Sequence, residues 1–592
     1  MSTGRETSRK ILAALRRLLH NEQLVLLVLA VFMGALASYG AIAFRYLILL
    51  IQGISFGTFS DTLYTHAASL PAWQVVLVPT AGGLLIGLFV HYFMPGRRPH
   101  AVADVIEAVA LRSGRMGIRA GLGAAVVSAA SIGVGASVGR EGPVVHLGAA
   151  LCSRIARWFG LSRSLTINLV GCGVAAAVAA SFNAPIAGTF FALEVIIGHY
   201  AITAFAPIVL ASVTGTIISR AEFGDFPAFI LPGQTIASAL EFPAFALLGV
   251  VSAVAAIIFM RSIGIARDLA MKTPLPRMLH PMVGGFLVGL LALAFPEVLG
   301  VGYGTTDAAL RGNIELYLLL ALIAAKTAAV AISLGSGFGG GVFSPSLFIG
   351  AVVGGAFGII ATSVFPELSS GHSAYTLVGM GAVAGAVLGA PISTILIIFE
   401  MTGDYAITVA VMVAVVIASI ITQQMFGQSF FAWQLEQRGI NLTRGRETGL
   451  LAETTVADVM KADYTAVTPE TPIGVLREKL QTAPYGTLFV VRESGALAGT
   501  VTLSDLAEAA FDTSMDSLLK ATDVARSRPP ALEKAADLDA ALKLMESAHE
   551  EHIAVIDDAD SRRMVGLVHQ VDVMLAYNRA LLRMHREEHG VL

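Results

Sequence analysis

The sequence predicts an α-helical membrane protein with many spans, followed by a soluble α/β region. Hydrophobic residues make up 55% of the 592 residues and charged residues 14%, and the mean hydropathy of +0.74 lies outside the range of soluble globular proteins. Apolar runs close to the about 20 residues that cross a bilayer as a helix recur through the first 425 residues. From about residue 436 the sequence becomes polar and alternates strand-like with helix-like runs.

The composition also excludes several classes of protein. The net charge is −3 and the basic residues occur in short clusters, so we expect no nucleic-acid partner. The two cysteines, Cys152 and Cys172, lie in apolar sequence, which disfavours a disulfide scaffold. The membrane part holds no metal-ligand motif, no nucleophile with a base and no phosphate-binding lysine motif. We therefore expect neither an enzyme nor a required cofactor or metal.

Residues 1–22 are predicted to form an amphipathic helix on the cytoplasmic surface of the membrane. Leu12, Leu15 and Leu19 fall on one helical face, with basic residues interspersed. The apolar run from Leu24 continues far beyond the about 7 to 15 residues of a signal-peptide core. The positive charges place the N-terminus in the cytoplasm, and the cell membrane is the expected location.

The membrane part, residues 23–435, contains an internal repeat. "GVGASVGREGPVVHLGA" matches "GSGFGGGVFSPSLFIGA" without gaps at an offset of 202 residues, and "NAPIAGTFFALE" matches "GAPISTILIIFE" at an offset of 206. The two matches divide this part into halves of about 23–220 and 240–435. Glycine-broken apolar segments at equivalent places are typical of transporters whose site lies between the repeats.

The glycine-rich segments predict an anion site. Glycine-rich helix starts leave backbone N–H groups accessible, and the helix dipole adds partial positive charge there. Such partial charges hold an anion and still release it. Glu141, in "GREGP", would compete with the anion when ionised and leave when protonated, so it is a candidate gate. The alternative is that these glycines only allow close packing of helices.

The motifs "GREGP", "FNAPIAGTFFALE", "GSGFGGGVFSP" and "GAPISTILIIFEMTGDY", in this order, resemble the CLC family of chloride channels and chloride/proton exchangers. The resemblance implies a homodimer with one anion pathway per subunit and two inverted halves of tilted, broken helices. It also implies that Glu141 is the gating glutamate. By the same motifs, the outer anion site corresponds to the backbone amides of Arg140, Glu141 and Gly142, and the more central donors to the amides of Val342 and Phe343.

Three positions depart from the family pattern. Exchangers of the family usually carry a second, proton-carrying glutamate where this chain has Val195, as is common in members that act as channels. The serine and tyrosine hydroxyls that usually contact the central anion fall on His100 and Phe431. His100 would either donate an imidazole N–H to the anion, more strongly at low pH, or face water at a helix end beside Arg97 and Arg98.

Four further residues receive structural interpretations. Glu194 and Glu400 end the two copies of the second repeat motif, and we interpret both as helix caps or hydrogen-bond partners rather than transport residues. The Arg140 side chain is expected to have a buried partner or to face the cytoplasm instead of touching the anion. His146 is expected to face protein.

The soluble part contains a repeat of its own. Each copy has an Asp-Val pair, a helix, an apolar strand and then "GTVTLSD" or "GLVHQVD". It resembles a pair of CBS domains, which we place at 452–512 and 513–592, after a linker at 436–451. In such domains a hydroxyl can meet a phosphate and an aspartate can bind a ribose, and Thr502 and Asp505 fit this pattern.

The second CBS-like copy keeps the aspartate as Asp572 but has His569 in the hydroxyl position. The implied ligand is an adenine nucleotide: ATP, ADP or AMP. The alternative is a structural dimerisation module. In either case the C-terminus is expected in the cytoplasm.

Together these features predict an anion (chloride) channel of the CLC type, opened by voltage or pH through displacement of Glu141 and regulated by the CBS pair. The alternative is a chloride/proton antiporter with weakened coupling, which Glu141 permits and Val195 disfavours. A CBS-regulated divalent-cation channel is disfavoured, because the glycine-rich helix starts carry the wrong partial charge for a cation.

Overall fold

The computed structural model describes residues 22–60, 63–225, 236–440, 454–483, 485–506, 514, 516 and 518–588. The predicted N-terminal amphipathic helix up to residue 21, linker residues 441–451, the predicted boundary at 512–513 and the last four residues lie outside this description. The chain divides into two compact units, residues 1–442 and 443–592, which are treated separately below.

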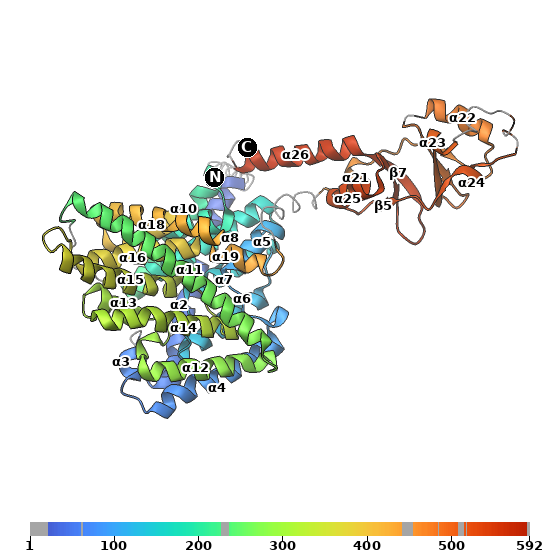
Figure 1. The fold of residues 1–592 in the computed structure, drawn as a ribbon. Coiled ribbons are helices and arrows are strands. Elements are labelled where there is room, and N and C mark those ends of the chain that lie inside the picture. Colours follow the sequence, from blue (N-terminus) through green and yellow to red (C-terminus); the bar gives the residue numbers. More distant parts are fainter. Residues whose placement is uncertain are drawn as a thin grey trace, which may run out of the picture. The chain divides into compact units, whose positions relative to one another are not determined.

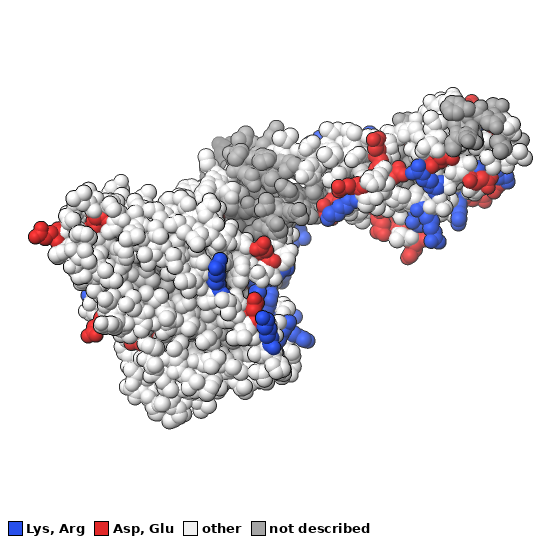
Figure 2. All heavy atoms as spheres, viewed as in Figure 1, with Lys and Arg blue, Asp and Glu red and all other residues white. Residues whose placement is uncertain are grey.

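The first unit is helical (Figure 1). Among the described residues, nine helices are long and apolar enough to cross a membrane. Figure 2 shows few charged side chains on the visible face of this unit, as expected for a surface against lipid. The helices are α2 (Glu22–Phe56), α3 (Leu63–Ala67), α4 (Ala72–Phe93), α5 (Val102–Leu111), α6 (Ile118–Gly133), α7 (Glu141–Trp158), α8 (Arg163–Phe182), α9 (Pro185–Phe191), α10 (Ile202–Phe223), α11 (Phe242–Lys272), α12 (His280–Ala294), α13 (Tyr303–Leu310), α14 (Leu316–Ser336), α15 (Phe343–Val364), α16 (His372–Leu388), α17 (Pro391–Thr402), α18 (Tyr405–Phe426) and α19 (Phe430–Glu436).

Several helices are short or broken, as the repeat motifs predict. Helices α9 and α17 both begin at a proline, Pro185 and Pro391, which suits the first turn because proline lacks the N–H that has no partner there. Each follows a residue in the left-handed region that ends the preceding helix: Asn183, with φ of 57°, and Gly389, with φ of 64°. Helix α9 then continues as a π-helical segment, η2 (Ala192–Ile197).

The two halves exchange helix caps. Glu194 accepts hydrogen bonds from the first backbone N–H groups of α17, including Ser393 N at 2.8 Å, and Glu400 accepts them from α9, including Ala187 N at 2.7 Å. Glu194 and Glu400 are 206 positions apart, and the first residues of α9 and α17 are also 206 positions apart. Each half therefore caps the equivalent helix of the other. A pseudo-two-fold relation between the halves follows. The prediction that these glutamates are caps is confirmed.

Other equivalent glycines serve packing. A Cβ added to Gly148 would lie 2.5 Å from the carbonyl oxygen of Gly173, where α7 crosses α8. A Cβ added to Gly350 would lie 2.4 Å from the carbonyl oxygen of Gly379, where α15 crosses α16. Both contacts are too close for any side chain, so the packing interpretation holds for these glycines.

The second unit is mixed α/β and repeats one topology. Its sheets have the orders β1-β2-β3-β4 and β5-β6-β7. In both, a parallel pair is followed by an antiparallel pair with a register shift near its end. The elements are α21 (Val456–Val459), β1 (Ala466–Val467), α22 (Ile473–Thr482), β2 (Thr487–Val491), β3 (Leu497–Thr502), α23 (Leu503–Leu506), α24 (Ala521–Val524), β4 (Arg526–Ser527), β5 (Ala531–Glu533), α25 (Leu538–Ala548), β6 (His552–Ile556), β7 (Met564–His569) and α26 (Gln570–Glu588).

The two copies share their cores. Val456, at the start of the first copy, is buried in the core of the second copy, and Ala521, at the start of the second, is buried in the core of the first. A third cluster joins Phe489 and Leu497 of the first copy to Met564 of the second. Because the copies exchange elements and share a core, we expect them to fold as one body.

Candidate functional site

The glycine-rich segments of the two halves meet through Gly139 and Gly341. These residues are 202 positions apart and equivalent in the repeat, and each donates its N–H to the other's carbonyl oxygen, at 2.7 and 2.8 Å. A Cβ at Gly139 would lie 2.9 Å from Pro345 Cδ and 3.0 Å from the Gly341 oxygen, so this pairing needs glycine. The pair brings together the beginnings of α7 and α15.

Glu141 begins α7, and its carboxylate is bound at the start of α15. Its Oε2 accepts hydrogen bonds from Ser344 N at 3.3 Å and from Ser344 Oγ, and its Oε1 accepts one from the Tyr303 hydroxyl at 2.6 Å. The residue is only 1% exposed. The carboxylate therefore lies where the first N–H groups of α15 have no partner within the helix and the helix dipole is positive. The glutamate occupies a place that suits an anion.

Arg140 lies beside this carboxylate and forms a long ion pair with it. Its Nε is 3.8 Å from Glu141 Oε1, and its guanidinium lies 4.6 Å from the centre of the Tyr303 ring. The side chain is only 12% exposed. Arg140 thus has the buried carboxylate of Glu141 and the half-buried ring of Tyr303 as partners, and a buried partner is one of the two alternatives expected from the sequence.

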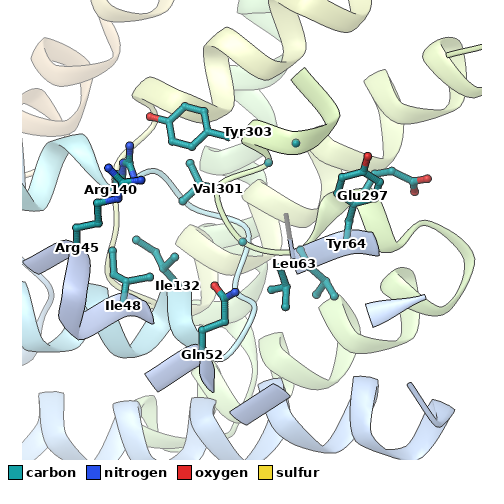
Figure 3. Close-up of a pocket in the computed structure, with 14 residues that line it drawn as sticks. Arg45, Ile48, Gln52, Leu63, Tyr64, Ile132, Arg140, Glu297, Val301 and Tyr303 are labelled. Carbon is teal, nitrogen blue, oxygen red and sulfur yellow. The ribbon is translucent and has the colours of Figure 1, made fainter. Parts of the chain in front are cut away.

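Two cavities flank Glu141. We call the first the Tyr303 cavity (Figure 3); it is lined by Arg45, Ile48, Gln52, Leu63, Tyr64, Ile132, Arg140, Glu297, Leu299, Gly300, Val301, Gly302, Tyr303 and Gly304. We call the second the Phe431 cavity; it is lined by Ala101, Val102, Gly142, Leu334, Gly340, Gly341, Val342, Phe343, Phe430, Phe431 and Gln434. Glu141 is bonded to Tyr303 of the first cavity and adjoins Gly142 of the second. Its carboxylate is therefore linked to the wall of the Tyr303 cavity, and its backbone to the wall of the Phe431 cavity.

The structure brings together most of the predicted anion-site positions. Gly142, Val342, Phe343 and Phe431 line one cavity, although they come from α7, the start of α15 and α19. Val195 is half-buried in η2. The carboxylate of its neighbour Glu194 accepts hydrogen bonds from the first backbone N–H groups of α17 and so caps that helix.

His100 does not line the Phe431 cavity. Its Nε2 lies 3.1 Å from the Pro95 carbonyl oxygen and its Nδ1 lies 3.1 Å from Asp104 Oδ1, so both ring nitrogens are occupied. The ring stacks on His146 with a centroid distance of 5.7 Å, so His146 faces protein as expected. Asp104 also accepts from Ala101 N at 2.9 Å as the cap of α5. This carboxylate holds the imidazole away from the cavity, and neither interpretation of His100 describes its surroundings.

Tyr303, Ser344 and Gln434 were missed by the sequence reasoning. Ser344 directly follows Phe343 in "VFSP", so its amide belongs to the same first turn as the predicted donors. Tyr303 lies in "GVGYG", a second glycine-rich segment before a helix, which was a usable signal. Gln434 follows Phe431 by one helical turn, so the face of α19 that carries Phe431 also carries Gln434.

In the soluble unit, the candidate nucleotide residues have partners within the unit. Asp505 Oδ2 accepts from Thr502 N at 2.8 Å and Thr502 Oγ1 at 2.7 Å, and Asp505 Oδ1 pairs with Arg526 at 2.6 Å. Partial burial acts to raise the pKa of Asp505, but these hydrogen bonds and Arg526 outweigh it, so the pKa is lowered. Asp572 pairs with Lys461 at 2.8 Å. The Thr-x-x-Asp pattern thus caps the start of α23.

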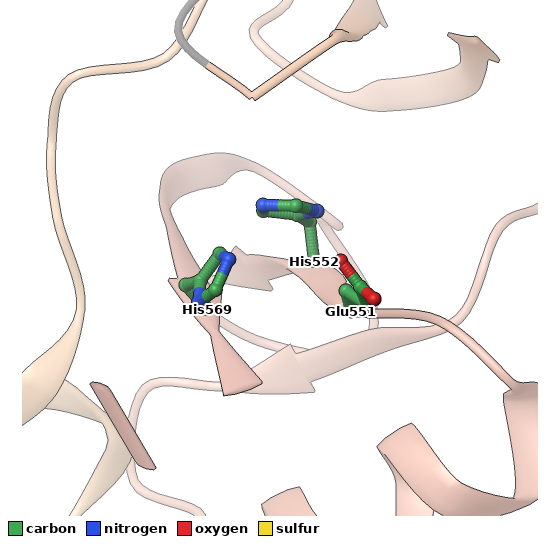
Figure 4. A group of neighbouring side chains, drawn as sticks. All are labelled: Glu551, His552 and His569. Atoms are coloured by element: carbon green, nitrogen blue, oxygen red, sulfur yellow. The ribbon is translucent and has the colours of Figure 1, made fainter. Parts of the chain in front are cut away.

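Glu551, His552 and His569 form a cluster in the second CBS copy (Figure 4). One potential ligand atom from each lies within 4.8 Å of the others. However, His569 Nδ1 accepts the Val571 N–H at 2.9 Å, which puts the ring proton of a neutral His569 on Nε2. The Nδ1 atom of His569 is therefore engaged within the unit, and the absence of a metal site stays a prediction.

Comparison with known proteins gives the family. The family described as "Voltage gated chloride channel" matches residues 82–423, more than half of the chain. The chain belongs to the CLC family. The family described as "CBS domain" matches residues 456–512 and 521–579. This CLC protein therefore carries a C-terminal CBS pair, as the motifs predict.

Relatives and solved structures agree with this assignment. A ClcB-like protein of Ralstonia nicotianae is 34% identical over 388 residues, which is 65% of this chain and 90% of that protein. The voltage-gated ClC-type chloride channel ClcB of Escherichia coli (strain HS) is 30% identical over 382 residues, 64% of this chain and 91% of its own.

Among solved structures, a slow cyanobacterial Cl⁻/H⁺ antiporter aligns with a TM-score of 0.62 and 22% identity, covering 71% of this chain and 98% of its own. A eukaryotic CLC transporter aligns with a TM-score of 0.59 and 19% identity, covering 92% and 97%. At these identities the likeness concerns the fold. The predicted fold class, a CLC-type helical membrane protein with an α/β CBS pair, is confirmed.

Proposed function

We propose that this CLC protein is an anion channel in which the ionised Glu141 side chain closes the pathway. The observation that carries the proposal is the hydrogen bond from Ser344 N to the Glu141 carboxylate at the start of α15. A chloride ion needs the same accessible N–H groups and the same positive end of the helix dipole. Anion and carboxylate therefore compete, and conduction requires Glu141 to leave.

Three events can displace Glu141. Protonation removes the charge that Ser344 and Tyr303 stabilise, and a membrane potential acts directly on a charged side chain inside the membrane. Entry of an anion from either cavity adds a like charge beside the carboxylate and works in the same direction. The displacement of Glu141 alone would therefore account for opening of the channel by voltage or by pH.

Val195 and Glu194 favour a channel over an antiporter. Coupled exchange needs a second side chain that passes the proton onward, and Val195 cannot titrate. Glu194 is adjacent, but its carboxylate is engaged with Ser393 N at 2.8 Å and with Ser393 Oγ. Moving a proton through it would release the cap of α17. An antiporter with weakened coupling is the second candidate, because Glu141 alone could still exchange protons on one side.

The deciding experiment is a reversal-potential measurement on the purified full-length protein in liposomes under crossed chloride and pH gradients. A channel gives a potential that follows the chloride gradient alone, whereas coupling shifts it with the pH gradient. Glu141→Gln is the matched variant: we expect it to conduct constitutively and to lose the pH response. A wild-type current carried by divalent cations instead of chloride, or an unchanged pH response in Glu141→Gln, would overturn the proposal.

We also propose that the protein is a homodimer whose CBS pair senses an adenine nucleotide. The family resemblance supports the dimer, and the Thr502–Asp505 pattern of CBS domains supports the nucleotide. Mass measurement of the full chain in nanodiscs tests the dimer.

Titration of the full chain with ATP, ADP and AMP, followed by calorimetry, tests the nucleotide, with Asp505→Asn as the variant that should lose binding. Absence of heat for all three nucleotides favours a purely structural CBS pair.

A further inference from the structure

We infer that the side-chain amide of Gln434 is the side-chain donor for an anion in the Phe431 cavity. This inference rests on the proposed anion pathway and names a residue that tunes it. The hydroxyl expected at position 431 is replaced by a phenyl ring, and the imidazole of His100 is bonded elsewhere. A donor is therefore needed from another position.

Gln434 is the one polar side chain in the lining of this cavity. Of the eleven described residues that line it, the others carry aliphatic or aromatic side chains or are glycines. The remaining polar groups of the wall are backbone N–H and C=O groups. An anion in the Phe431 cavity therefore finds a side-chain hydrogen-bond donor only at Gln434, among the described lining residues, beside the backbone N–H groups.

The Gln434 amide has no hydrogen-bond partner among the residues that the structure describes, although the side chain is half-buried. Its amide atoms are not among the buried atoms that lack a partner, so they are accessible, and a small partner can supply the missing hydrogen bond. An anion or water in the cavity is such a partner. The amide nitrogen has two N–H donors and no charge, so it binds an anion without trapping it.

The position of Gln434 is fixed from both ends of α19. At the start, Ser429 Oγ accepts from Ala432 N at 3.3 Å. Just beyond the end, Arg438 Nη1 lies 3.1 Å from Asp104 Oδ1. Asp104 caps α5, whose first residues Ala101 and Val102 line the same cavity. The donor and the opposing wall are thereby held together by an ion pair.

The orientation of α19 determines which groups lie beside the Gln434 amide. Phe431 and Gln434 are three positions apart, so they lie on one face of the helix, and the start of α15 contributes Val342 and Phe343 to the same cavity. An anion that accepts from those backbone N–H groups is then flanked by the Gln434 amide and the Phe431 ring. We expect anions that form strong hydrogen bonds to gain most from Gln434.

The test compares Gln434→Leu, which keeps similar bulk and removes both donors, with Gln437→Leu as a matched control. Gln437 lies on the same helix end, is exposed and bonds to Arg267 at 2.9 Å, away from the cavity. Both variants are made in the Glu141→Gln background, so that gating does not limit the flux. Chloride efflux, the chloride-to-nitrate permeability ratio and chloride binding by calorimetry are measured on full-length protein.

We expect chloride to bind about tenfold more weakly to Gln434→Leu, the loss of one hydrogen bond to a charged group, with a permeability ratio shifted toward nitrate. Gln437→Leu should match its parent. Adding Phe431→Tyr to Gln434→Leu should restore part of the chloride affinity by returning a hydroxyl, and this gain also shows that the variant is folded. Wild-type protein that moves no anion overturns the proposed function. Normal flux with unchanged affinity and selectivity in Gln434→Leu overturns this inference alone.

Discussion

The Tyr303 hydroxyl donates a hydrogen bond of 2.6 Å to Glu141 Oε1, across 162 positions of the chain. Tyr303 lines one cavity, and the residue after Glu141 lines the other. The bond therefore ties the candidate gate to the wall of the Tyr303 cavity and stabilises the closed arrangement. Its partner on the opposite oxygen of the carboxylate is Ser344.

Tyr303→Phe should open the pathway. The substitution removes a hydrogen bond to an ionised carboxylate, worth on the order of 1.5–3 kcal/mol, and leaves the ring against Arg140. We expect chloride efflux at neutral pH to rise about tenfold, because the proposed closed arrangement loses this bond. Tyr64→Phe, in the same cavity, is the control. Equal efflux from Tyr303→Phe and wild type would show that this bond does not hold the gate.

Ser344→Ala should act on the same equilibrium as Tyr303→Phe. Both residues bond to one carboxylate, so their effects should not add. We expect the double variant to conduct less than the product of the two single increases, because Glu141 is already released after the first. A purely additive double-mutant cycle in liposome efflux would mean that the two residues act on separate steps.

Gly139→Ala should abolish transport through a steric effect. The new Cβ would meet Pro345 Cδ at 2.9 Å and the Gly341 oxygen at 3.0 Å, so the reciprocal hydrogen bonds must lengthen and the starts of α7 and α15 must separate. The control is Gly117→Ala, whose Cβ would have its nearest neighbour at 4.0 Å. Efflux and thermal stability in detergent are the measurements, and normal values for Gly139→Ala would contradict the assigned geometry.

Removing either exchanged cap should destabilise the membrane unit by a similar amount. Glu400→Ala leaves the first N–H groups of α9 without an acceptor, and Glu194→Ala does the same for α17. A lost cap costs about 1–2 kcal/mol, which lowers the unfolding temperature by a few degrees. Scanning calorimetry of both variants checks this. A large loss for one and none for the other would show that the two caps are not equivalent.

The second CBS copy should lose stability as the solution becomes acidic. Burial and the nearby His569 lower the pKa of His552, with Glu551 opposing. The unfolded chain therefore takes up this proton at higher pH, near about 6.5, and stability falls as the pH drops below that value toward the lowered pKa. Hydrogen exchange of β6 and β7, corrected for the intrinsic rate, should quicken between pH 7 and pH 5. In His552→Gln this extra dependence should disappear.

The repeats made much of the fold predictable. Gapless matches made Gly139 equivalent to Gly341 and Glu194 equivalent to Glu400 in the sequence. In the pseudo-symmetric fold, the two glycines contact each other and each glutamate caps a helix of the other half. Anion-site amides could be predicted because a helix start exposes N–H groups whatever its side chains are. Features that depend on the backbone and on the internal repeat could therefore be predicted from the sequence.

Features that depend on single side chains could not be predicted in this way. Tyr303 lies in no repeat motif and meets Glu141 only because α13 packs beside α15. His100 took the position of a family serine, yet an acidic cap four residues later binds its ring. The nitrogens of a histidine ring bond to whichever strong acceptor lies nearby in the fold. The order of residues in the sequence does not identify that acceptor.

The exchanged caps of Glu194 and Glu400 have an evolutionary consequence. Each glutamate satisfies the helix start of the opposite half, so the same bonds form equally well between two separate, identical chains of half the length. A half-length ancestor assembled as a symmetric pair would already have had both caps and the reciprocal glycine contact. Joining two such copies in one chain would leave each copy free to diverge, and the repeat offset of 202 residues pairs Glu141 of one half with Phe343 of the other.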